Sequence, residues 1–225
     1  MSDYIQTYKD LHLEFDAIAT GFLGSKEQVD IVIDFIQTFK QEGVFVLVDP
    51  VMGDHGKLYT TYTPEMCAKM KQLVQYADLM TPNLTELVTL VDRPYPTTLP
   101  TFDELEEMCQ QLSQQGPQHI VVTGIPFNEK QILNFIYNQG EDYQIVMVDR
   151  IGEDRCGTGD VISSVIAGSY LNDIVSMRAS KEQPYLLPNN ILQKTQVPNY
   201  YGLCFEEYLY ELEKSKDDII YIIQE

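Results

Sequence analysis

Apolar positions along this chain follow two alternating patterns. Short continuous apolar runs are typical of strands buried on both faces, and they occur at Phe15–Thr20, Val44–Val48 and His119–Thr123. Asp78–Thr81 is predicted to be a further short strand. Apolar residues at helical spacing separate these runs. They predict helices from Ser25 to Gly43, from Thr63-Pro64 onward, from Pro82-Asn83 to Leu90 and from Thr101 to Gln115. This alternation predicts an α/β fold whose mostly parallel central sheet carries helices on both faces.

Local signals sharpen several of these boundaries. Ser25 followed by Gln28, and Thr101 followed by Glu104, have the spacing of capping boxes, in which two side chains satisfy the first backbone N–H groups of a helix. Gly43 is expected to end the first of these helices. Residues 1–14 are polar and are expected to be partly helical.

The alternation changes after Gly124. Two apolar stretches, Gln131–Tyr137 and Tyr143–Asp149, flank a turn at Asn138–Gly140, and this pattern predicts a β-hairpin. A helix at Val161–Tyr170 follows a glycine-rich stretch.

Composition narrows the class of protein. A chain of 225 residues with 44% hydrophobic residues fits one soluble domain. The net charge of −19 argues against nucleic acid or an anionic membrane as a partner. Four cysteines without a CxxC pair indicate free thiols in a reducing compartment. No apolar run approaches the roughly 18 residues of a membrane span, and no signal peptide pattern is seen, so we expect a cytoplasmic protein.

The sequence Cys156-Gly157-Thr158-Gly159-Asp160 immediately precedes an apolar helix. Backbone N–H groups at a helix N-terminus lack partners and favour anions, and glycines allow a ligand to approach closely. The stretch therefore predicts a phosphate cradle, with Asp160 placed to accept a proton. The alternative is an ordinary glycine turn with an acidic residue in the first helical turn.

Polar or glycine residues end four successive predicted strands. Ligands of open parallel sheets bind beyond the carboxyl ends of the strands. These residues are Gly21, Asp49, Thr81 with Asn83, and Thr123 with Gly124. Each has an ordinary structural explanation as a turn or cap, but together they predict a site.

Asn83 and Glu86 are three residues apart at a helix start, so both side chains can face one edge. Oxygen ligands of this kind suit Mg²⁺, which binds through few carboxylates together with phosphates. The alternative is a capped helix with a solvated glutamate.

Five motifs in a fixed order resemble the pyridoxal kinase branch of the ribokinase-like superfamily. The resemblance covers roughly residues 1–175 and, weakly, Tyr201–Leu212. The motifs are Asp49-Pro50-Val51-Met52-Gly53-Asp54, Lys57-Leu58-Tyr59, Thr81-Pro82-Asn83-Leu84-Thr85-Glu86, Val122-Thr123-Gly124 and Gly157-Thr158-Gly159-Asp160.

The resemblance implies ATP-dependent phosphorylation of the 5′-hydroxymethyl group of pyridoxal, pyridoxine or pyridoxamine. By this analogy, Asp160 deprotonates the alcohol and contacts the substrate. The backbone N–H groups of Gly157, Thr158 and Gly159 form the anion hole. Phe22 matches an aromatic position near the vitamin ring.

The resemblance also assigns the nucleotide side of the site. Asn83 and Glu86 match a metal and phosphate motif, with Asp49 and Glu86 as the implied ligands of Mg²⁺. The segment Asp54–Tyr59 matches a loop that shields the reaction from water, which places Asp54 and Tyr59 near the nucleotide. The residues matching positions around the nucleotide phosphates and a monovalent cation such as K⁺ are Asp49, Thr81, Thr123 and Gly124.

The resemblance also sets an expectation for domain organisation. It implies a single ribokinase-like domain over residues 1–225 that forms a homodimer. Family members carry further strands before the region matching Met1–Leu13, so the first strands of the fold are expected to be missing here. Residues 173–199 hold three prolines and do not resemble the C-terminal helices of the family.

Two other functions stay open at this point. One is a related kinase acting on hydroxymethylpyrimidine, which shares the glycine cradle and the sheet. The other is a catalytically impaired chain that binds nucleotide only, which the missing strands favour.

Overall fold

The computed structural model describes residues 1–151 and 156–171, which fall into two compact units. The larger unit holds Met1–Asn128 and Ile132–Met147, and the smaller holds, among the described residues, Glu129–Gln131 with residues 148–151 and 156–171. The atypical segment predicted at 173–199 lies outside the described residues.

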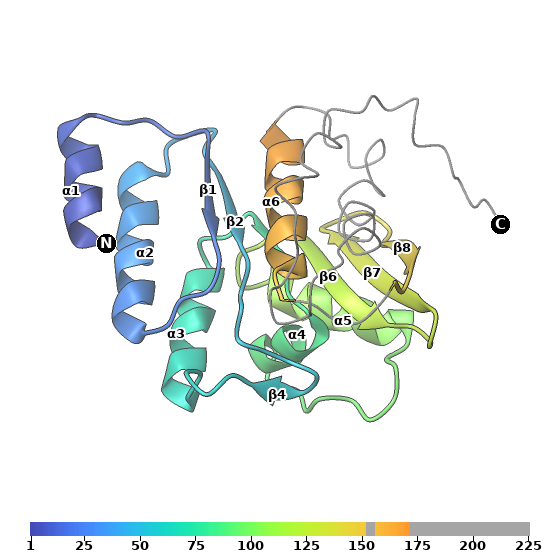
Figure 1. The fold of residues 1–225 in the computed structure, drawn as a ribbon. Helices are drawn as coiled ribbons and strands as arrows, with labels where there is room; N and C mark the ends of the chain where they lie inside the picture. The colour runs from blue at the N-terminus through green and yellow to red at the C-terminus, as the bar shows by residue number, and fades with distance from the viewer. Residues whose placement is uncertain (152–155, 172–225) are drawn as a thin grey trace. The chain divides into compact units, whose positions relative to one another are not determined.

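A six-stranded sheet forms the centre of the fold, in the order β1-β2-β5-β6-β7-β8 (Figure 1). Its first four strands are parallel, and β7 runs antiparallel to β6. The strands are β1 Ala17–Thr20, β2 Phe45–Val48, β5 Leu79–Met80, β6 His119–Pro126, β7 Gln131–Asn138 and β8 Gln144–Asp149. The predicted α/β class with a mostly parallel sheet is confirmed, and the predicted hairpin strands are neighbours in it. Strand β6 is longer than predicted, since it continues past Gly124 through a register shift between Val122 and Ile125.

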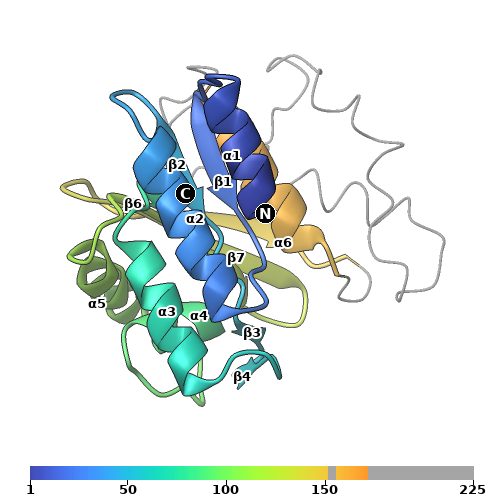
Figure 2. The ribbon, with the colours of Figure 1, turned by 90° about the vertical axis from the view of Figure 1, so that its left-hand side faces the viewer.

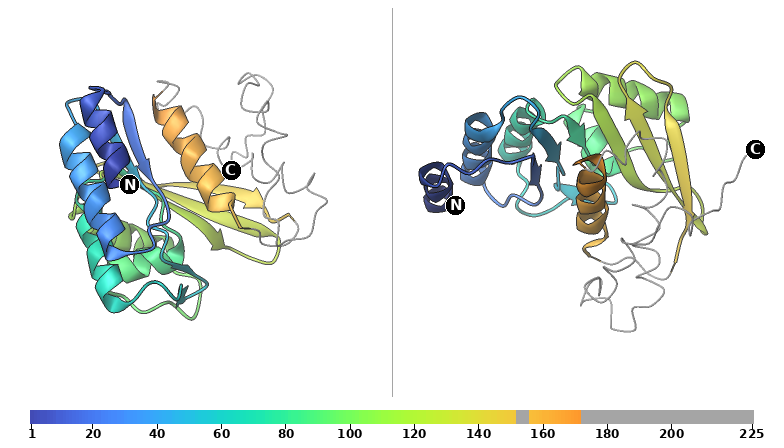
Figure 3. Two further views of the ribbon diagram at one scale, coloured as in Figure 1. Left: turned by 60° about the vertical axis from the view of Figure 1, so that its left-hand side comes forward. Right: turned by 90° about the horizontal axis from the view of Figure 1, so that it is seen from above.

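The larger unit holds five described helices, of which the first precedes β1 and the others lie between strands of the sheet. They are α1 Ser2–Asp10, α2 Lys26–Phe39, α3 Pro64–Val74, α4 Leu84–Leu90 and α5 Phe102–Ser113. Figure 2 shows α1, α2 and α3 side by side, and Figure 3 shows α2 and α3 along one face of β1 and β2. Within the larger unit this supports helices on one face, and the prediction of helices on both faces stays a prediction.

The start of α2 differs from its predicted capping box. The Ser25 hydroxyl accepts from the Gln28 N–H at 3.2 Å, as expected. The Gln28 side chain, however, accepts from the N–H of Gly24 at 2.7 Å instead of closing on Ser25. The helix also ends at Phe39, before the predicted Gly43, because Lys40 has an extended backbone.

The core shows which face of the sheet each strand residue occupies. Val46, Val48, Met80 and Val122 are buried in the cluster that α2–α5 complete. Their strand neighbours Leu47, Leu79 and Val121 point to the opposite face, because side chains alternate along a strand, and they are buried as well. Strands buried on both faces explain why the sequence shows continuous apolar runs instead of alternation.

Candidate functional site

Three polar residues lie together at the carboxyl ends of the parallel strands. Asp49 follows β2, Thr81 follows β5, and Thr123 lies in β6 beside Asn83. Their backbones join across strands, since the Asp49 N–H donates to Thr20 at 3.1 Å and the Thr123 N–H donates to Pro82 at 2.9 Å. All three residues are buried, with 6%, 3% and 9% of their surface exposed. Alternation from Leu47, Leu79 and Val121 places them on the face opposite the helical core.

The first turn of α4 closes this group. Asn83 is the N-cap, and its side-chain oxygen accepts from the Glu86 N–H at 3.0 Å. Glu86 Oε2 accepts from the Asn83 N–H at 2.8 Å, so the two residues form a reciprocal capping box. We call Asp49, Thr81, Asn83, Glu86 and Thr123 the polar edge.

The Glu86 side chain also reaches the loop after β2. Its Oε1 accepts from the N–H of Met52 at 3.0 Å. Both carboxyl oxygens therefore accept backbone N–H groups, and the residue is only 3% exposed. The alternative interpretation, a capped helix with a solvated glutamate, is right about the cap. It is wrong about the glutamate, which is buried.

Burial dominates the electrostatics of Glu86. The pKa of this carboxyl is raised to about 8, chiefly by loss of hydration and in smaller part by the charge of the neighbouring Asp49. The N–H groups of Asn83, Met52 and Gly53 oppose this by favouring the charged form of the carboxyl. Two carboxyl groups thus share a buried space, where a cation would offset their repulsion.

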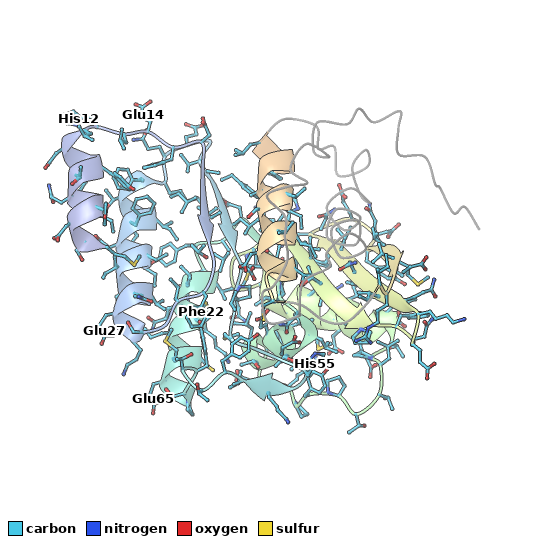
Figure 4. The ribbon with its side chains drawn as sticks, viewed as in Figure 1. His12, Glu14, Phe22, Glu27, His55 and Glu65 are labelled. Carbon is cyan, nitrogen blue, oxygen red and sulfur yellow. The ribbon has the colours of Figure 1, made fainter. Side chains whose placement is uncertain are left out.

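A short antiparallel ribbon stands over α4. Its strands are β3 Gly53–Asp54 and β4 Lys57–Leu58, and we call Gly53–Leu58 the ribbon. His55 and Gly56 have φ of 49° and 75°, the left-handed backbone that a two-residue hairpin turn requires. Figure 4 shows His55 at this turn.

Side chains of α4 hold the ribbon at both ends. The Asn83 amide nitrogen donates to the Gly53 carbonyl at 2.7 Å. The Thr85 hydroxyl accepts from the Gly56 N–H at 2.9 Å. Asp54 and Tyr59 of this loop were predicted from the sequence, whereas the role of Thr85 was missed, although Thr85 lies inside the same motif as Asn83. Asp54 and Tyr59 are exposed.

The glycine after Thr123 is also fixed by a side chain. Gly124 has a φ of 68°, and its N–H donates to Asn134 Oδ1 of β7 at 3.1 Å. Asn134 is 2% exposed. A buried polar side chain therefore holds the backbone of β6 where its register shifts between Val122 and Ile125. A single asparagine in a predicted hairpin gave no signal of this role.

Phe22 lies in the loop between β1 and α2 (Figure 4). The residue is 55% exposed, so its ring is accessible to a ligand. It makes an edge-to-face contact with Tyr62, with ring centroids 6.2 Å apart.

The glycine cradle belongs to the smaller unit. Helix α6 spans Thr158–Leu171, directly after Gly157, whose φ is 92°. The first helical bond runs from the Val161 N–H to the Gly157 carbonyl at 3.1 Å, so Thr158, Gly159 and Asp160 precede it. Asp160 is exposed in the first turn, as predicted, and Cys156 is an exposed free thiol.

The larger unit therefore brings together the predicted nucleotide and metal residues, and the smaller unit carries the predicted catalytic ones. Within the described part of the chain, no three His, Cys, Asp or Glu side chains form a metal cluster. Asp49 and Glu86 would leave most ligands of a cation to phosphates and water, as Mg²⁺ prefers. None of the described helices has the length and apolar character needed to cross a bilayer.

The chain matches a known protein family and several related structures. The model of the phosphomethylpyrimidine kinase family matches residues 6–197. A structure from Bacteroides thetaiotaomicron, provisionally described as a phosphomethylpyrimidine kinase and crystallised with pyridoxal, is 36% identical with a TM-score of 0.88. The match covers 95% of this chain and 76% of that one.

Two further relatives are described as pyridoxal kinases. The structure from Lactobacillus plantarum is 25% identical with a TM-score of 0.82, over 93% of this chain and 75% of that one. The PdxY protein of Proteus mirabilis is 27% identical over 84% of this chain and 66% of its own length. The chain thus spans just under two thirds of that curated relative.

Proposed function

The chain belongs to the phosphomethylpyrimidine kinase family, and from this premise we propose that it is a pyridoxal kinase-type phosphotransferase. It would transfer the γ-phosphoryl group of ATP to the 5′-hydroxymethyl group of pyridoxal, pyridoxine or pyridoxamine. The observation that carries the proposal is the polar edge, where buried oxygen groups from separate segments meet and where Asn83 bonds the ribbon.

In the proposed reaction, the Asp160 carboxylate accepts the alcohol proton. The alcohol oxygen then bonds to the γ-phosphorus, the bond from that phosphorus to the bridging oxygen breaks, and ADP leaves. The N–H groups of Gly157, Thr158 and Gly159 would stabilise charge on the phosphoryl oxygens. Phosphoryl transfer needs mainly positioning and charge stabilisation, which fits a site made of backbone N–H groups and carboxylates.

Asp49 and Glu86 are the proposed holders of Mg²⁺, and their hard oxygen atoms and mutual repulsion fit a divalent cation. Bound there, the ion would neutralise charge on the nucleotide phosphates. Thr81, Thr123 and Gly124 are proposed around the phosphates and a monovalent cation such as K⁺. Asp54 and Tyr59 of the ribbon region would exclude water, and Phe22 would face the vitamin ring.

An ADP-release assay with Mg-ATP and pyridoxal tests this proposal. Asp160→Asn is expected to lower kcat by about 10²- to 10⁴-fold, the usual contribution of a general base. Asp103→Asn is the matched control, because Asp103 is also an exposed aspartate in the first turn of a helix, α5. Equal activity of wild type and Asp160→Asn would exclude the assigned base.

A hydroxymethylpyrimidine kinase is the second candidate. The matching family and the 36% identical structure both carry phosphomethylpyrimidine kinase descriptions, which favours it. Product analysis after incubation with both alcohols at equal concentration separates the two activities. Binding of ATP without turnover of either alcohol would instead support a chain that binds nucleotide only.

Oligomeric state and location follow the same analogy. We propose a cytoplasmic homodimer whose partners are ATP and a small alcohol. Light scattering coupled to size-exclusion chromatography measures the mass directly and would refute the dimer if it returned the 25.8 kDa of one chain.

A further inference from the structure

The loop that carries Phe22 is bounded by glycines. Gly21 and Gly24 flank Phe22 and Leu23, and a Cβ added at Gly21 would meet nothing within 4 Å. Glycine backbones have more conformational freedom than others, so this loop needs contacts from outside to hold one conformation. One such contact is the bond from the Gly24 N–H to Gln28.

Tyr62 supplies a second contact, from a distant part of the chain. Its hydroxyl donates to the Leu23 carbonyl at 2.9 Å in a buried setting. Its ring meets the Phe22 ring edge-to-face at an interplanar angle of 62°. Tyr62 is only 4% exposed, whereas Phe22 is 55% exposed, so a fixed ring supports an accessible one.

The backbone of Tyr62 is itself bonded to the residues that flank the ribbon, and it lies next to the start of α3. Its N–H donates to the Tyr59 carbonyl at 2.9 Å, and the Tyr59 N–H donates to Met52 at 2.9 Å. The next residue, Thr63, is the N-cap of α3. Tyr62 therefore joins the loop before α2 to the loop before α3.

Tyr62 also lies within electrostatic reach of the polar edge. The pKa of its hydroxyl is raised to about 12, chiefly by burial and in smaller part by the carboxyl groups of Glu86 and Asp49. The hydroxyl consequently stays protonated near neutral pH and can donate to Leu23 throughout.

We propose that Tyr62 is a positioning residue for the alcohol substrate, since it holds the Gly21–Gly24 loop and the Phe22 ring in place. It does not touch reacting atoms and acts through Phe22. The substrate part of this inference rests on the proposed function, and the positioning of Phe22 by Tyr62 does not.

Steady-state kinetics test the substrate part. Tyr62→Phe removes one buried hydrogen bond and keeps the ring. It is expected to raise KM for pyridoxal about five- to tenfold while KM for ATP changes less than about twofold. Tyr76→Phe is the matched control, because the Tyr76 hydroxyl also bonds a distant residue, Gln37, at 2.7 Å outside the site. An unchanged KM for pyridoxal, or an equal rise in both KM values, would overturn the proposal.

A fluorescence measurement tests the positioning without any turnover. The chain holds no tryptophan, so Phe22→Trp creates a single reporter in the loop. Adding Tyr62→Phe to this variant is expected to increase acrylamide quenching and lower the anisotropy of the reporter, whereas adding Tyr76→Phe is not. If wild type turns over no alcohol, the proposed function fails while this result still decides the positioning. Unchanged quenching and anisotropy would refute it.

Discussion

The buried carboxyl of Glu86 gives a prediction that needs no ligand. In the unfolded chain this group titrates near 4.5, the ordinary pKa of a glutamate side chain, and in the folded chain its pKa is raised to about 8. Between these values the folded state holds a proton that the unfolded state has lost. The free energy of unfolding should therefore fall as pH rises through this window and level off above it.

The size of the effect follows from the width of the window. Each pH unit corresponds to about 1.4 kcal/mol, so the interval predicts a loss on the order of a few kcal/mol. Glu86→Gln keeps the shape of the protonated group but cannot ionise. Near pH 5 the variant and wild type should differ by less than about 1 kcal/mol, because each has one acceptor for the N–H groups of Met52 and Asn83. Near pH 9 the variant should be the more stable by a few kcal/mol.

Urea unfolding across this pH range, without Mg²⁺ or nucleotide, measures the difference. Glu104→Gln is the control, because Glu104 forms the same capping box with Thr101 on α5 but is exposed. Near pH 9 this control should lack the gain in stability of a few kcal/mol that is expected for Glu86→Gln, because an exposed side chain loses little hydration on folding. If the difference between Glu86→Gln and wild type stayed constant with pH, the reasoning about burial would be refuted.

Three further stability predictions follow from other positions, each measured by urea unfolding at neutral pH. Gly53→Ala should cost about 1–3 kcal/mol, because a Cβ there would overlap the Lys57 carbonyl oxygen; no loss would mean that the ribbon backbone can shift to make room for the methyl group. Phe135→Ala should lower the free energy of unfolding by about 3–5 kcal/mol, since the ring is fully buried in β7. A loss of only about 0.5 kcal/mol, which is typical of exposed positions, would contradict the described core. Thr101→Ala should cost about 1 kcal/mol by removing the α5 cap, and its effect should add to that of Phe135→Ala.

The sequence predicted some features that depend on local chemistry and missed others, since the Gln28 side chain bonds Gly24 and not Ser25. The capping box of Thr101 and Glu104 formed as expected, because its two hydrogen bonds join residues three apart. The buried strands were also visible locally, because a strand buried on both faces needs apolar residues at consecutive positions. The ends of helices were predicted less accurately. Gly43 was expected to end α2, but the helix ends at Phe39, because Lys40 has an extended backbone.

The sequence predicted which residues of the candidate site lie near one another, but it did not predict the hydrogen bonds that hold them. Asp49, Thr81, Asn83 and Thr123 follow from the rule that parallel strands end at one edge. The bond from the Met52 N–H to Glu86 spans 34 positions, and that from Tyr62 to Leu23 spans 39. Such contacts depend on how distant loops pack, and no local pattern in the sequence reports them.

The double role of the first turn of α4 limits where this chain can vary. Asn83 and Glu86 cap the helix with the same side chains that hold Gly53 and Met52. A substitution at either position therefore disturbs both the cap of α4 and the loop contact, so the two cannot be altered separately through these residues. His55, at the ribbon tip, has an exposed side chain and takes no part in the cap. Sequence variation in the loop should therefore arise at the His55 side chain, because side chains of the α4 segment hold the backbone at Gly53, at Met52 and, through Thr85, at Gly56.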